Sequence, residues 1–421
     1  MNETTSLRPD TSSAGPIELA GWLANTGLRN LPLEQMVDGF CVRLNQMGIA
    51  VARMFVGVNT LHPMIRARSM IWDRVTGPSV RFEFNHAEIA NPIWQQSPFA
   101  RMLREGITEE RRSLTDPEII PPEPVFSELH AAGMTEWFGV TFPFGEREVH
   151  LGASHEADSA NQLGLVCSLA TDRSGGFGVD ELALLQRLLP VFAVAVKGTT
   201  MRSIGRGLLA TYLGNDPADR VLGGTIMRGE VQSVEAVLFL ADLRDFTRLA
   251  DIMPGRDLIA MLDDYFDCMA RPVVKRGGEI LKFMGDGLLA TFGIGDALRA
   301  DVCRTALDAA SEAIGAVADL NSRRSAAGQL IAELDIALHV GEVLYGNVGI
   351  DARLDFTVIG PAVNEASRIE LLCKELGWNV LVSQEFAAAA TYCRGRLGSV
   401  GRHRLRGVRV ETELFTLMAP T

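Results

Sequence analysis

The chain lacks the features that mark secreted, membrane-spanning and disulfide-rich proteins. Its six cysteines are scattered along 421 residues without a CxxC pair, which argues against a disulfide framework and suits a reducing compartment. The N-terminus, MNETTSLRPDTSSAGP, lacks the basic-then-apolar order of a signal peptide. The most apolar window, residues 182–196, contains Gln186, Arg187 and Pro190 and is too short to cross a bilayer. We therefore expect a cytoplasmic protein with no membrane partner.

The chain also has no run rich in lysine and arginine, and its net charge is −12. A basic surface is the usual mark of nucleic-acid binding, so we expect no nucleic-acid partner. The content of 47% hydrophobic and 22% charged residues is typical of a globular protein. Because 421 residues exceed one ordinary hydrophobic core, two domains are expected.

The N-terminal half reads as a disordered segment, residues 1–16, followed by an α/β domain, residues 17–198. Strands are predicted at residues 49–59, 67–75, 135–144 and 163–170. A helix is predicted from Val179 to about Lys197, with Asp180 and Glu181 well placed in its first turn.

The passage CSLATDRSGGFGVDELALLQRLLPVFAVAV resembles the end of a GAF domain, a small α/β sensor module. The resemblance implies a domain that binds a small-molecule ligand or mainly supports dimerisation. A domain that only holds two chains together stays an open alternative. The spacing of His86, His130, His150 and His155 does not indicate haem or metal, so these histidines are expected at the surface or in hydrogen bonds.

Residues 199–230 are predicted to form a linker. Leu208, Leu209, Tyr212 and Leu213 have the spacing of a short helical seam with a partner chain, and Gly214-Asn-Asp-Pro would end it. A helical connector suits a signalling relay and equally suits any two-domain protein.

The C-terminal domain, residues 231–421, shows a clear succession of elements. Strands are predicted at residues 234–240, 279–284, 288–292, 332–340, 343–349 and 355–359, and helices at 256–273, 296–323 and 361–376. Gly285-Asp-Gly marks a hairpin between the second and third strands. The order β-α-β-β-α-β predicts a ferredoxin-like α+β sheet.

Two aspartates lie where strands of this sheet end. Asp242 follows an apolar strand and Asp286 occupies the hairpin tip. Each alone has a plain structural explanation, as a strand-end cap or a turn residue. As a pair they supply the carboxylate oxygens that Mg²⁺ prefers. Backbone amides near the following helix start would then cradle phosphates, and we assign triphosphate contacts to Arg244, Asp245, Phe246 and Thr247.

Three further polar residues stand out against apolar surroundings. Asn364 and Arg368 lie one helical turn apart, nearly opposite an apolar stripe. They form either a solvated face or a pair that orients a ribose and neutralises charge on a phosphate. Lys282 is alone in the strand EILKFM, where it points to solvent or donates to a base edge.

Four segments together resemble the catalytic domain of class III adenylate/guanylate cyclases: FLADLRDFT, EILKFMGDGLLATF, ALHVGEVLYGNVG and DFTVIGPAVNEASRIE. They occur in the family's order and cover residues 230–420. The resemblance implies two Mg²⁺ or Mn²⁺ ions at Asp242 and Asp286, with the carbonyl of Leu243 as a further ligand. It assigns Lys282 and Thr357 to purine selection and Asn364 and Arg368 to the transition state. Arg406 falls where the family often has a phosphate-binding lysine.

The resemblance also implies an activity and a partner. A lysine with threonine goes with adenine, so ATP is the expected substrate and 3′,5′-cyclic AMP with pyrophosphate the expected products. Family sites take the aspartates from one subunit and the other residues from its partner, so a homodimer is expected. Two departures are Arg244-Asp245, where many members have a small residue and glycine, and Thr357, where animal enzymes have Asp. The alternatives are a guanylate cyclase, a diguanylate cyclase, since MGDGLLA loosely echoes a GGDEF hairpin, or a catalytically silent nucleotide-binding signalling protein.

Overall fold

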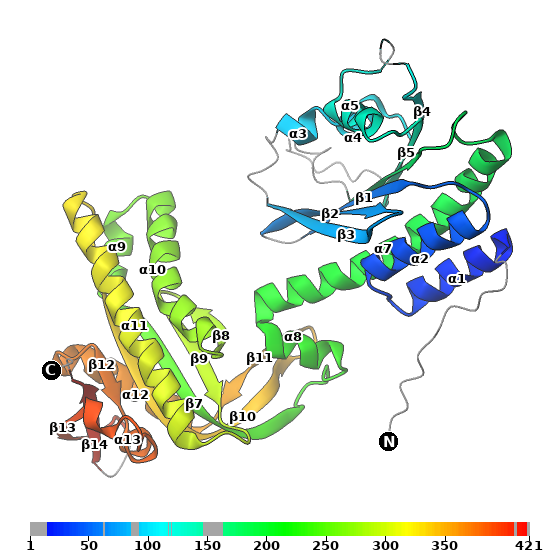
Figure 1. Ribbon diagram of the computed structural model, residues 1–421. Helices are drawn as coiled ribbons and strands as arrows, with labels where there is room; N and C mark the ends of the chain where they lie inside the picture. Colours follow the sequence, from blue (N-terminus) through cyan, green and yellow to red (C-terminus); the bar gives the residue numbers. More distant parts are fainter. Residues whose placement is uncertain are drawn as a thin grey trace. The chain divides into compact units, whose positions relative to one another are not determined.

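The structure is a computed structural model that describes residues 15–61, 64–85, 92–116, 118, 120–145, 163–407 and 411–418. Of the segment 1–16 that was expected to be disordered, residues 1–14 lie outside the described residues, as do His86, His150 and His155, whereas Pro16 already begins a helix. The chain divides into two compact units, with the division between Leu208 and Leu209 (Figure 1). No helix in the described residues is long and apolar enough to cross a membrane.

The N-terminal unit is built on a six-stranded sheet in which every neighbouring pair is antiparallel. The strands, in spatial order, are β3 (Gly77–Asn85), β2 (Ile65–Asp73), β1 (Arg53–Asn59), β6 (Gly164–Thr171), β5 (Glu136–Pro143) and β4 (Glu109–Ser113). All four strands predicted from the sequence are present. β3 and β4 were not predicted.

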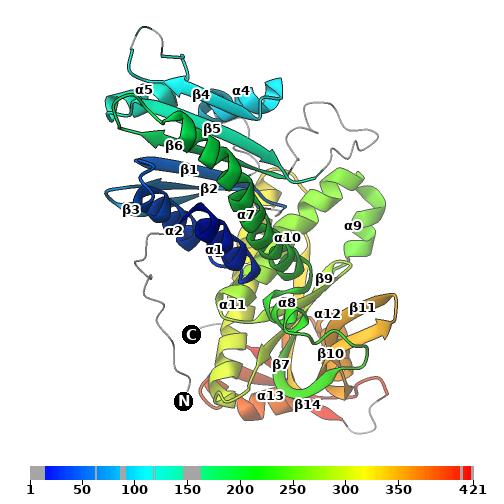
Figure 2. The same ribbon diagram turned by 90° about the vertical axis from the view of Figure 1, so that its right-hand side faces the viewer.

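Helices cover both faces of this sheet, as alternate strand residues require. On one face lie α1 (Pro16–Leu28), α2 (Leu33–Gln46) and α7 (Val179–Leu213), side by side in Figure 2. The other face carries α4 (Pro98–Glu105) and α5 (Pro124–Ala131), with α3 (Pro92–Gln95) nearby in the chain. The neighbours Trp137 and Phe138 on β5 belong to opposite cores.

The long helix α7 begins where the sequence predicts and continues well past Lys197, the predicted end. Gly198 lies inside it without ending it, because an interior glycine costs only about 1 kcal/mol relative to alanine. The helix ends at Leu213, where Gly214 has φ +97°, a left-handed conformation that favours glycine. The predicted helical segment around Leu208–Leu213 is thus confirmed, and its seam with a partner chain stays a prediction.

The C-terminal unit contains the predicted β-α-β-β-α-β succession. It runs β7 (Val231–Arg244), α10 (Gly255–Lys275), β8 (Glu279–Met284), β9 (Gly287–Gly293), α11 (Arg299–Ala326) and β10 (Glu333–Ile350). In space the strands are ordered β10-β7-β9-β8, all antiparallel. Helices α10 and α11 pack side by side on one face of this sheet (Figure 1).

Further elements extend the sheet and cover its second face. β12 (Val380–Val382), β14 (Thr412–Leu417) and β13 (Leu397–His403) continue it beyond β10, and β11 (Arg353–Ile359) pairs with the end of β10. Helix α12 (Pro361–Leu376), with the predicted bounds, packs on the face opposite α10 and α11. The short elements are α8 (Asn215–Leu222), α9 (Phe246–Ile252), α13 (Gln384–Ala389) and the 3₁₀ helix Arg394–Arg396.

β10 differs from the prediction of two strands at residues 332–340 and 343–349, because it continues unbroken through Gly341. No turn occurs between the two predicted strands. A Cβ at Gly341 would lie 2.6 Å from the Cβ of Ala362 on α12. Gly341 therefore allows α12 to pack closely on the strand.

Candidate active site

The structure places Asp242 and Asp286 beside each other. Asp242 lies near the end of β7, and Asp286 lies in the turn between β8 and β9. β9 pairs with β7 up to Leu288 opposite Ala241, which brings the hairpin tip against Asp242. A Cβ at Gly287 would lie 2.5 Å from Asp242 Oδ1. The hairpin thus requires a glycine next to the carboxylate, and both aspartates are half-buried.

The two carboxylates have no compensating positive charge from the part of the chain that the structure describes. Burial raises the pKa of Asp242 to about 7, with further contributions from the negative charges of Asp286 and Asp335. Burial also raises the pKa of Asp286. Within the described residues, neither aspartate has an ion pair with lysine or arginine. Crowded carboxylate oxygens without a cationic partner fit a divalent cation such as Mg²⁺ or Mn²⁺.

Two acidic residues near this pair were missed by the sequence analysis. Asp335 on β10 lies directly opposite Asp242 in the strand register. Burial raises the pKa of Glu370 on α12 to about 7, and the charges of Asp242, Asp335 and Asp286 add to the effect. The available signal for Asp335 was its position near the start of a predicted strand, which would lie beside the end of β7 if the two strands paired antiparallel. No local pattern pointed to Glu370.

The side chains of Arg244 and Asp245 are engaged within the chain. The Arg244 guanidinium bonds to Asp335, with Nε donating to Oδ2 at 3.0 Å, and also bonds to Glu333. Asp245 pairs with Lys374 of α12. Phe246 is buried in the core at the start of α9, and Thr247 is exposed. Any contact of Arg244 or Asp245 with a triphosphate therefore falls to the backbone amides rather than to these side chains.

The residues predicted to read the purine lie on β8 and β11. Lys282 is exposed, and its Nζ donates to Asp355 Oδ2 at 2.9 Å. This bond lowers the pKa of Asp355. Asp355 and Thr357 are two residues apart on β11, so they share one face of the strand. The ion pair therefore holds Lys282 on the face that carries Thr357. The sequence analysis missed Asp355, although the alternation in LDFTV placed it on that face.

On α12 the predicted apolar stripe is confirmed. Its buried members are Ala362, Ala366, Ile369 and Cys373. Asn364 is exposed and Arg368 is half-buried. A Cβ at Gly407 would lie 3.7 Å from Arg368 Nη2, so the segment that contains exposed Arg406 lies next to this guanidinium.

Within one chain, the predicted residues fall into separate groups. Arg368 and Glu370 are two residues apart on a helix, so their side chains leave α12 in nearly opposite directions, about 160° apart. The charges of Asp242 and Asp286 raise the pKa of Glu370. Arg368 contributes to the pKa of neither aspartate, but it lowers that of Glu365. The arginine thus points away from the aspartates of its own chain.

Comparison with known proteins finds relatives of the C-terminal unit. Residues 230–419 match the family model described as "Adenylate and Guanylate cyclase catalytic domain". The chain is 34% identical over 160 residues to an adenylate cyclase of Anabaena cylindrica, covering 37% of this chain and 31% of that protein. It is 34% identical over 189 residues to adenylate cyclase 1 of Rhizobium meliloti (strain 1021), covering 44% and 27%. The matches thus span less than a third of the length of either relative.

Among solved structures, the adenylyl cyclase CyaB from P. aeruginosa matches with 24% identity and a TM-score of 0.41. The match covers 46% of this chain and 97% of that one. The family model spans both adenylate and guanylate cyclases and lies within the C-terminal unit, which begins at Leu209. Residues 230–419 of this chain are therefore similar to the catalytic domain of adenylate and guanylate cyclases.

Proposed function

We propose that the C-terminal unit converts ATP to 3′,5′-cyclic AMP and pyrophosphate in a homodimer. The observation that carries the proposal is the uncompensated carboxylate pair Asp242 and Asp286, with Arg368 directed away from it on the same chain. The names of the two adenylate cyclase relatives support ATP. The residues Lys282 and Thr357 support it further, as the family resemblance implies.

The carboxylates of Asp242 and Asp286 and the carbonyl of Leu243 would hold two Mg²⁺ or Mn²⁺ ions. When bound, such ions supply the positive charge that lowers the pKa of the ribose 3′-hydroxyl and neutralises the triphosphate. The 3′-oxygen forms a bond to the α-phosphorus, and the bond from that phosphorus to the pyrophosphate oxygen breaks. Asp242 would lie close enough to the ribose to take the hydroxyl proton.

The remaining residues bind and orient the nucleotide from the partner subunit. Lys282 Nζ donates to an acceptor on the adenine edge while Asp355 holds the lysine against β11, and Thr357 offers its hydroxyl to the same edge. Asn364 orients the ribose. Arg368 stabilises the negative charge that develops on the α-phosphoryl oxygens. Arg406, in the segment beside Arg368, adds charge for the triphosphate.

For the N-terminal unit we propose a GAF-like sensor or dimerisation role. Its antiparallel sheet has helices on both faces, and its last helix, α7, extends to Leu213 at the edge of the catalytic unit. A continuous helix between two units can transmit a change in the first to the pairing of the second. A GAF-like unit that binds a small molecule would therefore alter the rate of product formation.

The test is product analysis with ATP and GTP, each with Mg²⁺ and with Mn²⁺. It uses full-length protein and a version that starts near residue 225. We expect cyclic AMP from ATP with both proteins, at different rates, and little product from GTP. Asp286→Asn is the control, expected to lower product formation by about a hundredfold or more. Cyclic GMP as the main product would overturn the choice of ATP, and unchanged turnover in Asp286→Asn would overturn the assigned site.

A further inference from the structure

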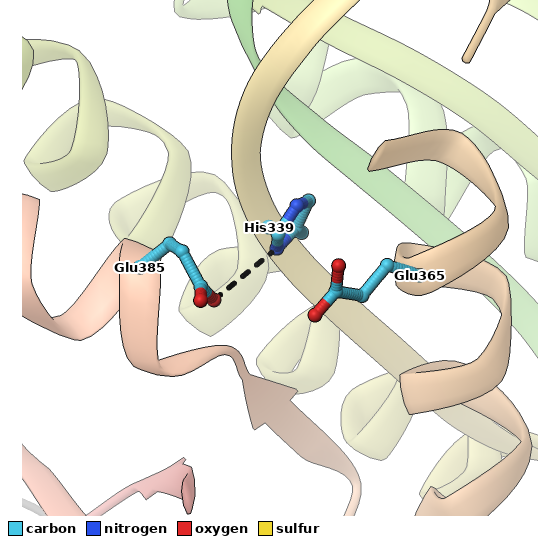
Figure 3. Close-up of side chains that lie close together, drawn as sticks. All are labelled: His339, Glu365 and Glu385. Carbon is cyan, nitrogen blue, oxygen red and sulfur yellow. Dashed lines mark ion pairs between the residues drawn. The ribbon is translucent and has the colours of Figure 1, made fainter. Parts of the chain in front are cut away.

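A second group of metal-ligand side chains lies in the C-terminal unit, apart from Asp242 and Asp286. His339 on β10, Glu365 on α12 and Glu385 on α13 each offer one ligand atom, and these atoms lie within 4.8 Å of one another. Figure 3 shows the two carboxylates on either side of the imidazole, each coming from a different element. His339 Nδ1 lies 3.8 Å from Glu385 Oε2.

The imidazole is fixed in place by its surroundings. His339 is 3% exposed. Its Nδ1 lies 2.9 Å from Ser383 Oγ, and that oxygen also accepts a bond at 3.0 Å from the Phe386 amide at the start of α13. Metal-binding histidines are commonly oriented by a hydrogen bond to the second ring nitrogen. Ser383 can therefore fix the orientation of the ring beside the two carboxylates.

The group borders a cavity of about 430 Å³ whose lining contains no lysine or arginine among the described residues. Glu342 also lines the cavity, so three carboxylates and one imidazole face it. Burial raises the pKa of Glu365, as does the charge of Glu385, whereas Arg368 lowers it. Burial lowers the pKa of His339, which keeps its ring neutral and able to bind a cation at neutral pH. The cavity is thus rich in electron-pair donors and poor in positive charge.

We propose that His339, Glu365 and Glu385 form a binding site for a divalent transition-metal ion of the zinc type. Imidazole nitrogen and carboxylate oxygen are both Zn²⁺ ligands, and sites with three protein ligands keep water in the fourth position. The nitrogen ligand distinguishes this site from the all-oxygen set at Asp242 and Asp286, because imidazole suits Zn²⁺ whereas Mg²⁺ prefers oxygen. The partly exposed Glu385 makes the ion exchangeable.

An ion bound there would join β10, α12 and α13. Glu365 directly follows Asn364 and precedes Arg368 by three residues, so the ion would restrain the helix that carries both. An effect of Zn²⁺ on product formation rests on the proposed cyclase function. Binding of Zn²⁺ does not rest on it.

The experiment measures Zn²⁺ binding to full-length protein in which Asp286→Asn weakens the other predicted metal site. A competing chromophoric chelator gives the affinity, and Co²⁺ gives a visible absorption spectrum that reports nitrogen and oxygen ligands. We expect one Zn²⁺ bound by the parent and affinity about tenfold or more weaker in Glu365→Gln and in Glu385→Gln. The Co²⁺ spectrum should change in both variants.

Glu342→Gln is the matched control, because Glu342 lines the same cavity but bonds to Ser233 and is not one of the three grouped residues. It should bind Zn²⁺ as the parent does. Melting curves without metal check that every variant is folded. Equal affinity in the parent, Glu365→Gln and Glu385→Gln would overturn the proposal, and so would an equal loss in Glu342→Gln. Because no turnover is measured, either result leaves the cyclase proposal untouched.

Discussion

Buried and half-buried carboxylates have different partners in the two units. In the N-terminal unit, Glu136 is 5% exposed and bonds to Arg111 and to the Phe177 amide. Glu110, 9% exposed, pairs with Arg101 at 2.7 Å. In the C-terminal unit, Asp242, Asp286 and Glu370 have raised pKa values.

The difference separates carboxylates that are paired within the fold from those for which we propose a cation partner. A buried carboxylate with an arginine partner is neutralised within the fold, and its removal leaves an unpaired cation. A carboxylate that is shielded from water and has no such partner lowers the free energy of unfolding while it is charged. Three such groups lie around one hairpin tip, where we propose that cations bind. The C-terminal unit does contain a partnered example, Asp335 with Arg244, beside this cluster.

The largest expected effect tests whether the aspartates and Arg368 serve one site across two chains. Asp286→Asn and Arg368→Ala should each be almost inactive as homodimers. When the two variants are co-expressed, half of the dimers are mixed and each mixed dimer has one intact site. Activity should therefore return to about a quarter of the parent value in a symmetric dimer, measured as cyclic AMP formed per chain.

Failure of this complementation would contradict a shared site. A control mixture of Asp286→Asn with Asp242→Asn should stay inactive, because both changes affect the same half of the site. Recovery of activity in the control would show that complementation does not depend on which half of the site each change affects.

A smaller effect concerns the purine. Replacing Lys282 by Glu and Thr357 by Cys together should shift the ratio of kcat/KM for ATP over GTP by about tenfold or more, because one charged hydrogen bond is worth about 1.5–3 kcal/mol. Asp355→Asn should raise KM for ATP with little change in kcat, because it frees Lys282 without removing it. Steady-state kinetics with both nucleotides measures these ratios. An unchanged ratio in the double variant would show that Lys282 and Thr357 do not select the purine.

The smallest effect is on stability, and its sign differs between the units. The raised pKa of Asp242 means that its favourable contribution is complete below the ordinary value of 3.8 and is lost as pH rises through about 7. Without metal at pH 8, Asp242→Asn should therefore raise the free energy of unfolding by about 1–2 kcal/mol, a value discounted for partial exposure. The gain should shrink at pH 5, where Asp242 is already protonated.

Glu136→Gln should have the opposite effect in the N-terminal unit. It removes a buried charge that Arg111 and the Phe177 amide require, so we expect a loss of about 1.5–3 kcal/mol. Chemical unfolding in the presence of a chelator measures both variants. If Asp242→Asn destabilised the protein as Glu136→Gln does, the distinction between the two classes of carboxylate would fail.

Much of the fold follows from periodicity. The apolar spacing in residues 361–376 predicted α12 with its correct bounds, and Gly285-Asp-Gly predicted the β8–β9 hairpin. The predicted bounds were wrong at residues 340–343, where β10 is unbroken, and at Lys197, beyond which α7 continues. Gly341 serves close packing against Ala362, and Gly198 lies inside α7. Local sequence does not distinguish these uses, because each depends on what packs against the residue.

The sequence by itself determined the order of the elements, the positions of Asp242 and Asp286 at strand ends, and the opposite faces of α12. These features depend on residues close together in the chain, whose spacing sets the direction of each side chain. Only the tertiary structure decided that Asp335 and Glu370 gather around Asp242, that Asp355 holds Lys282, and that His339 meets Glu365 and Glu385. Such groups form from residues far apart in the sequence, and strand register and helix packing bring them together.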